Sequence, residues 1–140
     1  MIAVLDASAA MEIVNGKRDS DAFLKALAVC EKVIAPGLFL IEVASALKKY
    51  VSAGMLDKLV VAELLSQADS LITVTVETRE IIVEAMSEAI RLNHSVYDML
   101  YFTLARRNGA ALITLDKKLN KLAAREGITI LVDIPVELLG

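Results

Sequence analysis

The sequence predicts a single α/β domain over residues 1–140, in which a parallel sheet carries helices on both faces. Short apolar, β-branched runs alternate with longer stretches of helical periodicity, the pattern of parallel strands joined by crossover helices. The first run, Met1-Ile-Ala-Val-Leu-Asp6, is apolar up to its last residue. Such a run is typical of a strand buried on both faces in the middle of a parallel sheet. At 140 residues, the chain has the length of one domain.

Five strands are expected, over residues 1–6, 32–36, 71–75, 110–114 and 128–132. Each is short and rich in aliphatic or β-branched residues, which favour extended backbone. The third run, Leu-Ile-Thr-Val-Thr, also alternates along its length. Glycine or an acid follows several of these runs and indicates where they end.

Seven helices are expected between the strands, over residues 7–15, 20–30, 38–52, 58–70, 77–92, 96–108 and 117–126. Asp6, Asp19 and Asp57 each precede a helix and are favourable N-cap residues, whereas Pro36-Gly37 opens the long third helix. Glycines follow three of the helices and can adopt the left-handed conformation that ends them: Gly54, Gly109 and Gly127.

The composition indicates a cytoplasmic protein that carries an apolar surface. Hydrophobic residues make up 56% of the chain and the mean hydropathy is +0.59, yet no apolar run approaches the ~20 residues of a membrane helix. We expect this excess to form a dimer face or a groove for a partner helix. The start lacks the basic region of a secretory signal. Cys30 is the only cysteine, which excludes an internal disulfide and a thiolate metal cluster.

The charge is unevenly distributed along the chain. The net charge is −3, which disfavours a protein that coats nucleic acid without specificity. Residues 99–125 nevertheless contain six basic side chains and one acid, Asp116. A contact with a polyanion and an ordinary solvated surface are both compatible with this segment. The six basic residues are Arg106, Arg107, Lys117, Lys118, Lys121 and Arg125.

Two acids stand at the ends of predicted strands. Asp6 ends the first, and Asp116 closes Leu112-Ile-Thr-Leu-Asp116. Ligands of open parallel sheets bind at the carboxyl ends of the strands, so both acids are candidate site residues. Each also has a structural alternative, because Asp is a favourable N-cap for the helix that follows.

Two further acids interrupt apolar helical stretches. Glu42 is the only ionisable residue from Val33 through Leu47, and a lone carboxylate on such a face is costly to bury unless it is paired, protonated or bound to a metal. Its alternative is a position at the edge of the apolar stripe, where it reaches water. Asp98 lies in a similar stretch, and its alternative is a capping box in which it binds the Ser95 amide.

We interpret Asp6, Glu42, Asp98 and Asp116 as one site. Two carboxylates about 4 Å apart repel by roughly 4 kcal/mol at an effective dielectric constant of about 20, so the cluster requires cations. An all-oxygen carboxylate set favours Mg²⁺ or Mn²⁺ and disfavours Zn²⁺. Mg²⁺ commonly binds together with substrate phosphates, which indicates phosphoryl chemistry.

Four stretches of the chain carry a family resemblance: Leu5-Asp-Ala-Ser8, Phe39-Leu-Ile-Glu-Val-Ala-Ser-Ala-Leu47, Tyr97-Asp-Met-Leu-Tyr-Phe-Thr-Leu-Ala105 and Leu112-Ile-Thr-Leu-Asp116. Together they resemble the PIN domain, and especially its VapC toxin branch, over nearly the whole chain. The resemblance implies a Rossmann-like three-layer sandwich with a parallel five-stranded sheet in the order 3-2-1-4-5. That order makes the first and fourth strands neighbours and brings Asp6 close to Asp116.

The resemblance also implies an activity and partners. It implies a Mg²⁺- or Mn²⁺-dependent endoribonuclease that hydrolyses RNA phosphodiester bonds, forms a homodimer and is blocked by a VapB-type antitoxin. Asp6, Glu42, Asp98 and Asp116 would be the catalytic and metal-binding residues, and Ser8 and Thr114 match family positions near the metals. Lys117 and Lys118, beside Asp116, are the candidates for contacts with the RNA backbone.

Other interpretations remain at this point. A housekeeping RNA-processing nuclease and a non-catalytic RNA- or protein-binding module of the same fold are the main alternatives. A phosphatase with an aspartyl nucleophile would require an acid where Ser8 stands, and neither GxGxxG nor GxxxxGK[ST] occurs. His94 is expected to be a surface or capping residue. Three aromatic residues, Tyr97, Tyr101 and Phe102, are expected to pack in the core or at a dimer face.

Overall fold

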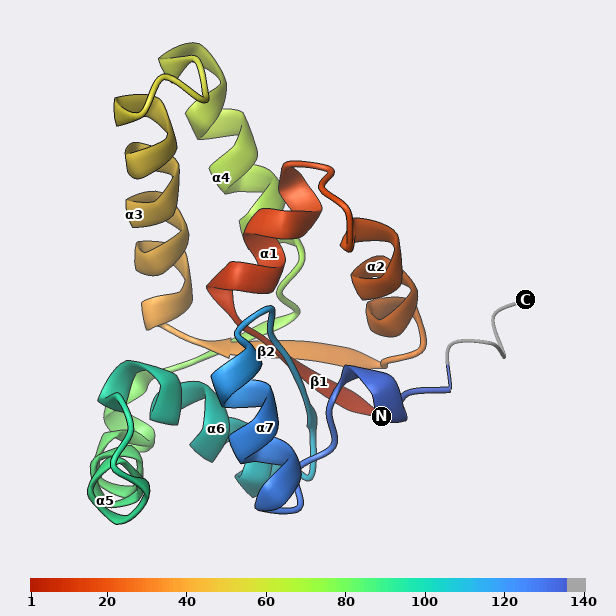
Figure 1. Ribbon diagram of the computed structural model, residues 1–140, viewed down its shortest axis with the longest axis vertical. Helices are drawn as coiled ribbons and strands as arrows, with labels where there is room; N and C mark the ends of the chain where they lie inside the picture. Colours follow the sequence, from red (N-terminus) through yellow and green to blue (C-terminus); the bar gives the residue numbers. More distant parts are fainter. Residues whose placement is uncertain (136–140) are drawn as a thin grey trace.

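A computed structural model describes residues 1–135 and contains a four-stranded parallel sheet between two layers of helices (Figure 1). Neighbouring strands lie in the order β3-β2-β1-β4, with β1 central, as its apolar sequence predicts. This confirms the α/β class and the adjacency of the first and fourth strands. The strands are β1 (Ile2–Leu5), β2 (Lys32–Pro36), β3 (Val74–Val76) and β4 (Ala111–Ile113).

Helices cover both faces of this sheet. Figure 1 shows α1 to α4 on one side and α5 to α7 on the other. Short 3₁₀ helices, Lys58–Val60 and Thr78–Glu80, precede α4 and α5, where continuous helices were predicted. The helices are α1 (Ala7–Val14), α2 (Ser20–Ala28), α3 (Leu38–Ser52), α4 (Val61–Ser70), α5 (Ile82–Leu92), α6 (Val96–Asn108) and α7 (Lys117–Arg125). Within residues 1–135, no helix is long and apolar enough to cross a membrane.

The core is centred on β1 and α6. Val4 and Leu5 are completely buried in the central strand, and α6 contacts that strand with a nearly continuous buried segment that includes Met99 and Phe102. Burying a side chain of this size contributes about 1.5–3 kcal/mol. Because β1 is held rigidly on both faces, the residue that follows it, Asp6, has a fixed position at the carboxyl edge of the sheet.

The predicted fifth strand is reduced to one bridge. Ile130 pairs in parallel with Leu112 of β4, which is the neighbour that the order 3-2-1-4-5 predicts. The Leu112 amide donates to the Thr129 carbonyl oxygen at 2.9 Å, and the Ile130 amide donates to the Asp133 carboxylate at 3.0 Å. The chain then turns into a 3₁₀ helix, Leu131–Asp133. The sheet therefore has four strands rather than five.

The third strand begins later than its sequence pattern predicts. The amides of Leu71 and Ile72 donate to Ala68 and Asp69 carbonyl oxygens, both at 3.1 Å, and so continue the last turn of α4. Thr73 already donates its amide to the Val33 carbonyl oxygen of β2 at 2.7 Å, and the regular pairing with β2 starts at Val74. Of the predicted run, Leu71 and Ile72 therefore follow the preceding helix, because its hydrogen bonds are local and already formed.

Candidate active site

Asp6 is a buried carboxylate with three hydrogen-bond donors. It is the N-cap of α1, and its Oδ1 accepts the Ala9 amide at 3.0 Å and the Ser8 hydroxyl at 2.7 Å. The Thr114 hydroxyl donates to Oδ2. Burial raises the pKa of Asp6 to about 6, although these donors oppose the shift. The capping alternative is therefore correct for Asp6, and the same carboxylate is almost fully buried away from water.

Ser8 and Thr114 connect the ends of β1 and β4. While the Ser8 hydroxyl donates to Asp6, its oxygen accepts the Leu115 amide at 3.0 Å. Thr114 likewise donates to Asp6 and accepts the Asp116 amide at 3.1 Å. Each hydroxyl thus uses both of its hydrogen-bonding functions across the two neighbouring strands. Both residues orient Asp6, and their expected location near a metal stays a prediction.

Glu42 lies on α3 and is oriented by a tyrosine of α6. The Tyr101 hydroxyl donates to Glu42 Oε1 at 2.6 Å, and the Tyr101 side chain is almost fully buried. Burial raises the pKa of Glu42, the Tyr101 bond opposes this, and the negative charge of Asp98 adds to it. Glu42 is therefore half-buried and lies within electrostatic range of Asp98.

Asp98 is oriented by a histidine one turn earlier in the chain. Its Oδ2 lies 2.9 Å from His94 Nε2, and the His94 side chain is only 11% exposed. Ser95 caps α6 by accepting the Tyr97 amide. Among the hydrogen bonds of residues 1–135, none joins Asp98 to the Ser95 amide, so the capping-box alternative is wrong.

Asp116 caps α7 and faces a polar cavity. Its Oδ1 accepts the amides of Lys118 and Leu119 at 2.9 and 3.0 Å, so the capping alternative is correct here too. Asp116 and Asp98 both line a cavity of about 330 Å³. Lys118 lines the same cavity, whereas Lys117 is exposed on the first turn of α7. The lining residues are Asn93, His94, Ser95, Asp98, Asp116 and Lys118.

Asp98 is the acid that links the other three. Its negative charge raises the pKa of both Asp6 and Glu42, so it lies within electrostatic range of each, and it shares the cavity with Asp116. The fold thus gathers all four acids at the carboxyl edge of the sheet. Within residues 1–135, however, no three His, Cys, Asp or Glu side chains are close enough to form a metal-binding group.

The negative charge of this site is not neutralised by basic side chains. In the part of the chain that the structure describes, the ion pairs of lysine and arginine lie elsewhere, and His94 is the one basic residue paired with any of the four acids. Carboxylates that repel one another without a countercharge raise each other's pKa and favour a bound cation. The arrangement is suited to binding a hard cation and a phosphate group together.

Two residues of this site are not among its sequence-predicted members. His94 was expected at the surface and Tyr101 in the core, yet each donates to or contacts a carboxylate of the site. The only sequence pattern that points to His94 is its spacing, four residues before Asp98, although His94 precedes the Ser95 cap and lies outside α6. Tyr101 has no such pattern, because its partner is 59 residues away. Tyr97, by contrast, is exposed, and Phe102 is buried.

Comparisons with known proteins agree with this fold. The family model of the PIN domain matches residues 3–125. The crystal structure of PAE2754 from Pyrobaculum aerophilum superposes with a TM-score of 0.74 and 23% sequence identity, covering 99% of this chain and 90% of that one. At this identity the superposition establishes the fold alone. A search of curated proteins finds no match to the chain.

Proposed function

Because this chain belongs to the PIN domain family, whose members are generally nucleases that use divalent metals, we propose that it is a Mg²⁺- or Mn²⁺-dependent endoribonuclease. Asp6, Glu42, Asp98 and Asp116 are its proposed catalytic and metal-binding residues. The substrate is RNA, and the reaction is hydrolysis of a phosphodiester bond.

One observation carries this proposal. Asp98 is close enough to Asp6 and Glu42 to raise their pKa values, and it shares a cavity with Asp116. Asp6 and Asp116 cap α1 and α7, whereas Glu42 and Asp98 lie near the N-terminal ends of α3 and α6. Helix capping does not explain why Glu42 and Asp98 lie at the same edge of the sheet, since neither residue caps its helix.

The donor set is compatible with a hard divalent ion. All four candidate ligands are carboxylates, and none is neutralised by lysine or arginine within residues 1–135. Mg²⁺ usually binds through one or two carboxylates and keeps several waters, so the absence of three converging side chains there is compatible with such binding. A bound divalent ion supplies positive charge to the phosphate and lowers the pKa of coordinated water.

The residues around the acids hold the reacting groups in place. Ser8 and Thr114 fix both oxygens of Asp6, Tyr101 fixes Glu42 and His94 fixes Asp98. Preorganised groups of this kind reduce the reorganisation needed when charge develops at the phosphate. Lys118, on the cavity wall, is placed to bind a phosphate oxygen of the substrate, with Lys117 beside it.

The test is cleavage of labelled single-stranded RNAs by purified protein with Mg²⁺, Mn²⁺ or EDTA. Asp98→Asn removes the negative charge that acts on both Asp6 and Glu42, and it is expected to abolish metal-dependent cleavage. Asp57→Asn is the matched control, because Asp57 is an exposed N-cap of a 3₁₀ helix outside the site. Cleavage that persists in EDTA or in Asp98→Asn would refute the proposal and favour a binding module.

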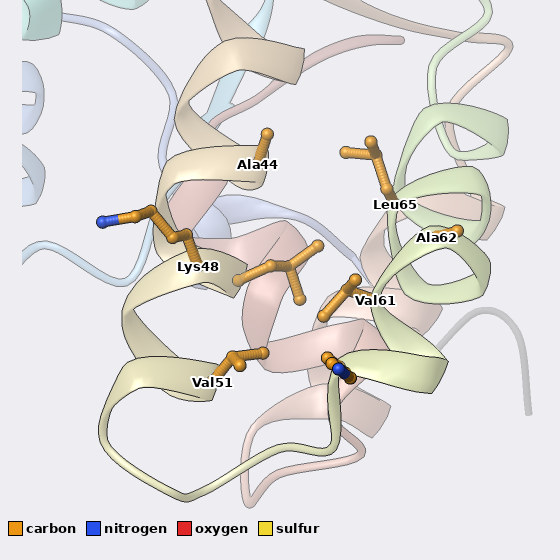
Figure 2. Close-up of a pocket in the computed structure, with 8 residues that line it drawn as sticks. Ala44, Lys48, Val51, Val61, Ala62 and Leu65 are labelled. Atoms are coloured by element: carbon orange, nitrogen blue, oxygen red, sulfur yellow. The ribbon is translucent and has the colours of Figure 1, made fainter.

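We further propose that the enzyme is the toxin of a VapBC-type pair. An apolar groove of about 420 Å³ lies between α3 and α4, with Lys48 and Lys58 on its walls (Figure 2). Its apolar lining is suited to one face of an amphipathic helix, and the two lysines to acids beside that face. A VapB-type antitoxin is the proposed occupant. The apolar part of the groove consists of Ala44, Leu47, Val51, Val61, Ala62 and Leu65.

Two variants test this partner. Expression of the wild type is expected to arrest growth, and coexpression of an antitoxin encoded beside the gene is expected to restore it. Ala62→Glu introduces a charge into the groove and should prevent this rescue. Ala22→Glu, at an exposed alanine of α2, should leave rescue intact. A wild type that cleaves RNA without arresting growth would instead support a housekeeping nuclease.

The proposed homodimer has a candidate face on α5. Val83, Met86 and Ile90 are 69%, 48% and 76% exposed, and their spacing places them along one side of the helix. Large apolar side chains in such a stripe favour burial against a second copy. Light scattering should give twice the chain mass for the wild type and the monomer mass for Ile90→Lys.

A further inference from the structure

Helix α7 has one buried face and one basic face. Leu119, Leu122 and Ala123 are buried against the core. Four basic residues are exposed on the rest of the helix, namely Lys117, Lys118, Lys121 and Arg125. At 3.6 residues per turn, these four lie within about 100° of arc. They therefore form a continuous positive stripe, which we call the α7 stripe.

The positive charge of the α7 stripe is not balanced by acids. None of its residues takes part in an ion pair within residues 1–135, whereas the arginines of α5 and α6 do. Arg106 and Arg107 bind Glu84, and Arg106 also binds Glu88. Six basic residues are clustered between 99 and 125 in sequence, but the fold neutralises two of them and leaves the four of α7 available.

The α7 stripe begins at the candidate active site. Asp116 caps α7, and Lys118 in its first turn lines the cavity that contains Asp98 and Asp116. The helix then runs from the carboxyl edge of the sheet back across its face (Figure 1). From Lys118 to Arg125 it covers about 10 Å, which corresponds to about three nucleotides of a stacked strand.

We propose that the α7 stripe binds the backbone of the single-stranded RNA where it extends out of the active-site cavity. This proposal rests on the ribonuclease activity proposed above and adds a second binding region, centred on Lys121 and Arg125, outside the catalytic cavity. In this arrangement the cavity holds the scissile phosphate, and the α7 stripe neutralises the next phosphates along the RNA strand.

The composition of the stripe favours nucleic acid over a protein partner. Protein interfaces usually contain an apolar centre within a polar rim. Among the residues of α7, no large apolar side chain is exposed. A row of cations without such a centre is instead suited to a polyelectrolyte, which gains affinity by releasing counterions.

The salt dependence of RNA binding tests this proposal. Binding of a fluorescent single-stranded RNA of 12 nucleotides is measured by anisotropy in EDTA, where cleavage is absent, at several KCl concentrations. The comparison is between the wild type and the double variant Lys121→Gln/Arg125→Gln. Arg18→Gln/Lys25→Gln is the control, because it removes the same two charges from exposed positions at the start and end of the α2 region.

A quantitative result is expected. Each phosphate contact on a single strand contributes about 0.7 to the slope of log K against log[KCl]. The stripe variant should therefore lose about 1.4 of slope, and at 0.1 M KCl its affinity should fall about 25-fold. The control should keep the wild-type slope. In cleavage assays the stripe variant should show a higher KM on the 12-nucleotide RNA and an unchanged kcat.

The failures are distinguishable. If the wild type cleaves RNA but the stripe and control variants have equal slopes, the stripe proposal is wrong and the ribonuclease proposal stands. If the wild type neither binds nor cleaves RNA, the ribonuclease proposal is wrong, and the stripe proposal that rests on it is wrong as well. A polyglutamate peptide serves as a second probe. If it binds as tightly as RNA and loses the same affinity in the stripe variant, the surface belongs to an acidic protein partner instead.

Discussion

Replacing Asp6 by asparagine should change how the stability of the metal-free protein depends on pH. The pKa of Asp6 is raised from 3.8 to about 6, chiefly by burial. An acid with a raised pKa binds its proton more tightly in the folded state than in the unfolded state. Its contribution to stability is therefore complete below pH 3.8 and is lost as the pH rises through 6. The difference between these pKa values corresponds to about 3 kcal/mol.

Urea denaturation in EDTA between pH 4 and pH 8 measures this effect. Relative to Asp6→Asn, the wild type should lose about 2.4 kcal/mol of unfolding free energy over that range, since asparagine does not ionise and the wild-type contribution is already partly lost at pH 4. Asp57→Asn, at an exposed cap, controls for the chemical change itself. Parallel pH profiles for the wild type and Asp6→Asn would refute the argument, because they would mean that ionising Asp6 costs nothing.

The same pair of proteins reports on metal binding. At pH 7.5, Mg²⁺ at 100 times its dissociation constant should stabilise the wild type by about 2.7 kcal/mol. This would offset most of the cost of the ionised Asp6. The effect should be much smaller in Asp6→Asn, which lacks the charge. Equal stabilisation of both proteins would place the metal away from Asp6.

Three further substitutions address other contacts of the site and the core. Tyr101→Phe removes the hydroxyl that donates to Glu42 and should lower kcat by about 5- to 30-fold, the equivalent of about 1–2 kcal/mol, with an unchanged far-ultraviolet circular dichroism spectrum. His94→Ala removes the side chain that holds the Asp98 carboxylate and should lower kcat to a similar extent, whereas His94→Gln should retain more activity. Equal losses of kcat in the two variants would exclude a role of His94 in positioning Asp98. Thr103→Val should raise the free energy of unfolding in urea by about 1 kcal/mol, because the buried Thr103 hydroxyl has no hydrogen-bond partner among residues 1–135. Destabilisation would contradict this reasoning.

The strand ends were predictable from local pattern. Asp6 and Asp116 each follow an apolar run and precede a helix, so both the edge position and the capping role can be derived from neighbouring residues. The structure places both acids accordingly. Glu42 and Asp98 could be singled out from the sequence only because each is an acid within an otherwise apolar stretch. Their proximity depends on how α3 and α6 approach the sheet, which no local pattern encodes.

The errors arose where distant or competing hydrogen bonds decide the outcome. The Asp98 carboxylate had two acceptable partners, the Ser95 amide and His94, and in the structure it binds His94. The fifth strand had the right composition, but after one bridge the chain turns into a 3₁₀ helix in which Asp133 binds the Ile130 amide. The Tyr101 hydroxyl finds Glu42 across two helices. In these cases the local sequence preference was read correctly, but the hydrogen-bond partner found in the structure was not the one that the local sequence suggests.

The Asp133 hydrogen bond also affects how the protein behaves towards other copies of itself. β4 is an outer strand, and outer strands expose unpaired amides and carbonyls to which a foreign strand can add. Here the single bridging residue, Ile130, presents an amide that is already bonded to Asp133, and the chain turns away at once. An incoming strand would have to break that bond before it could extend the sheet. The carboxylate of Asp133 therefore protects this edge of the sheet against aggregation.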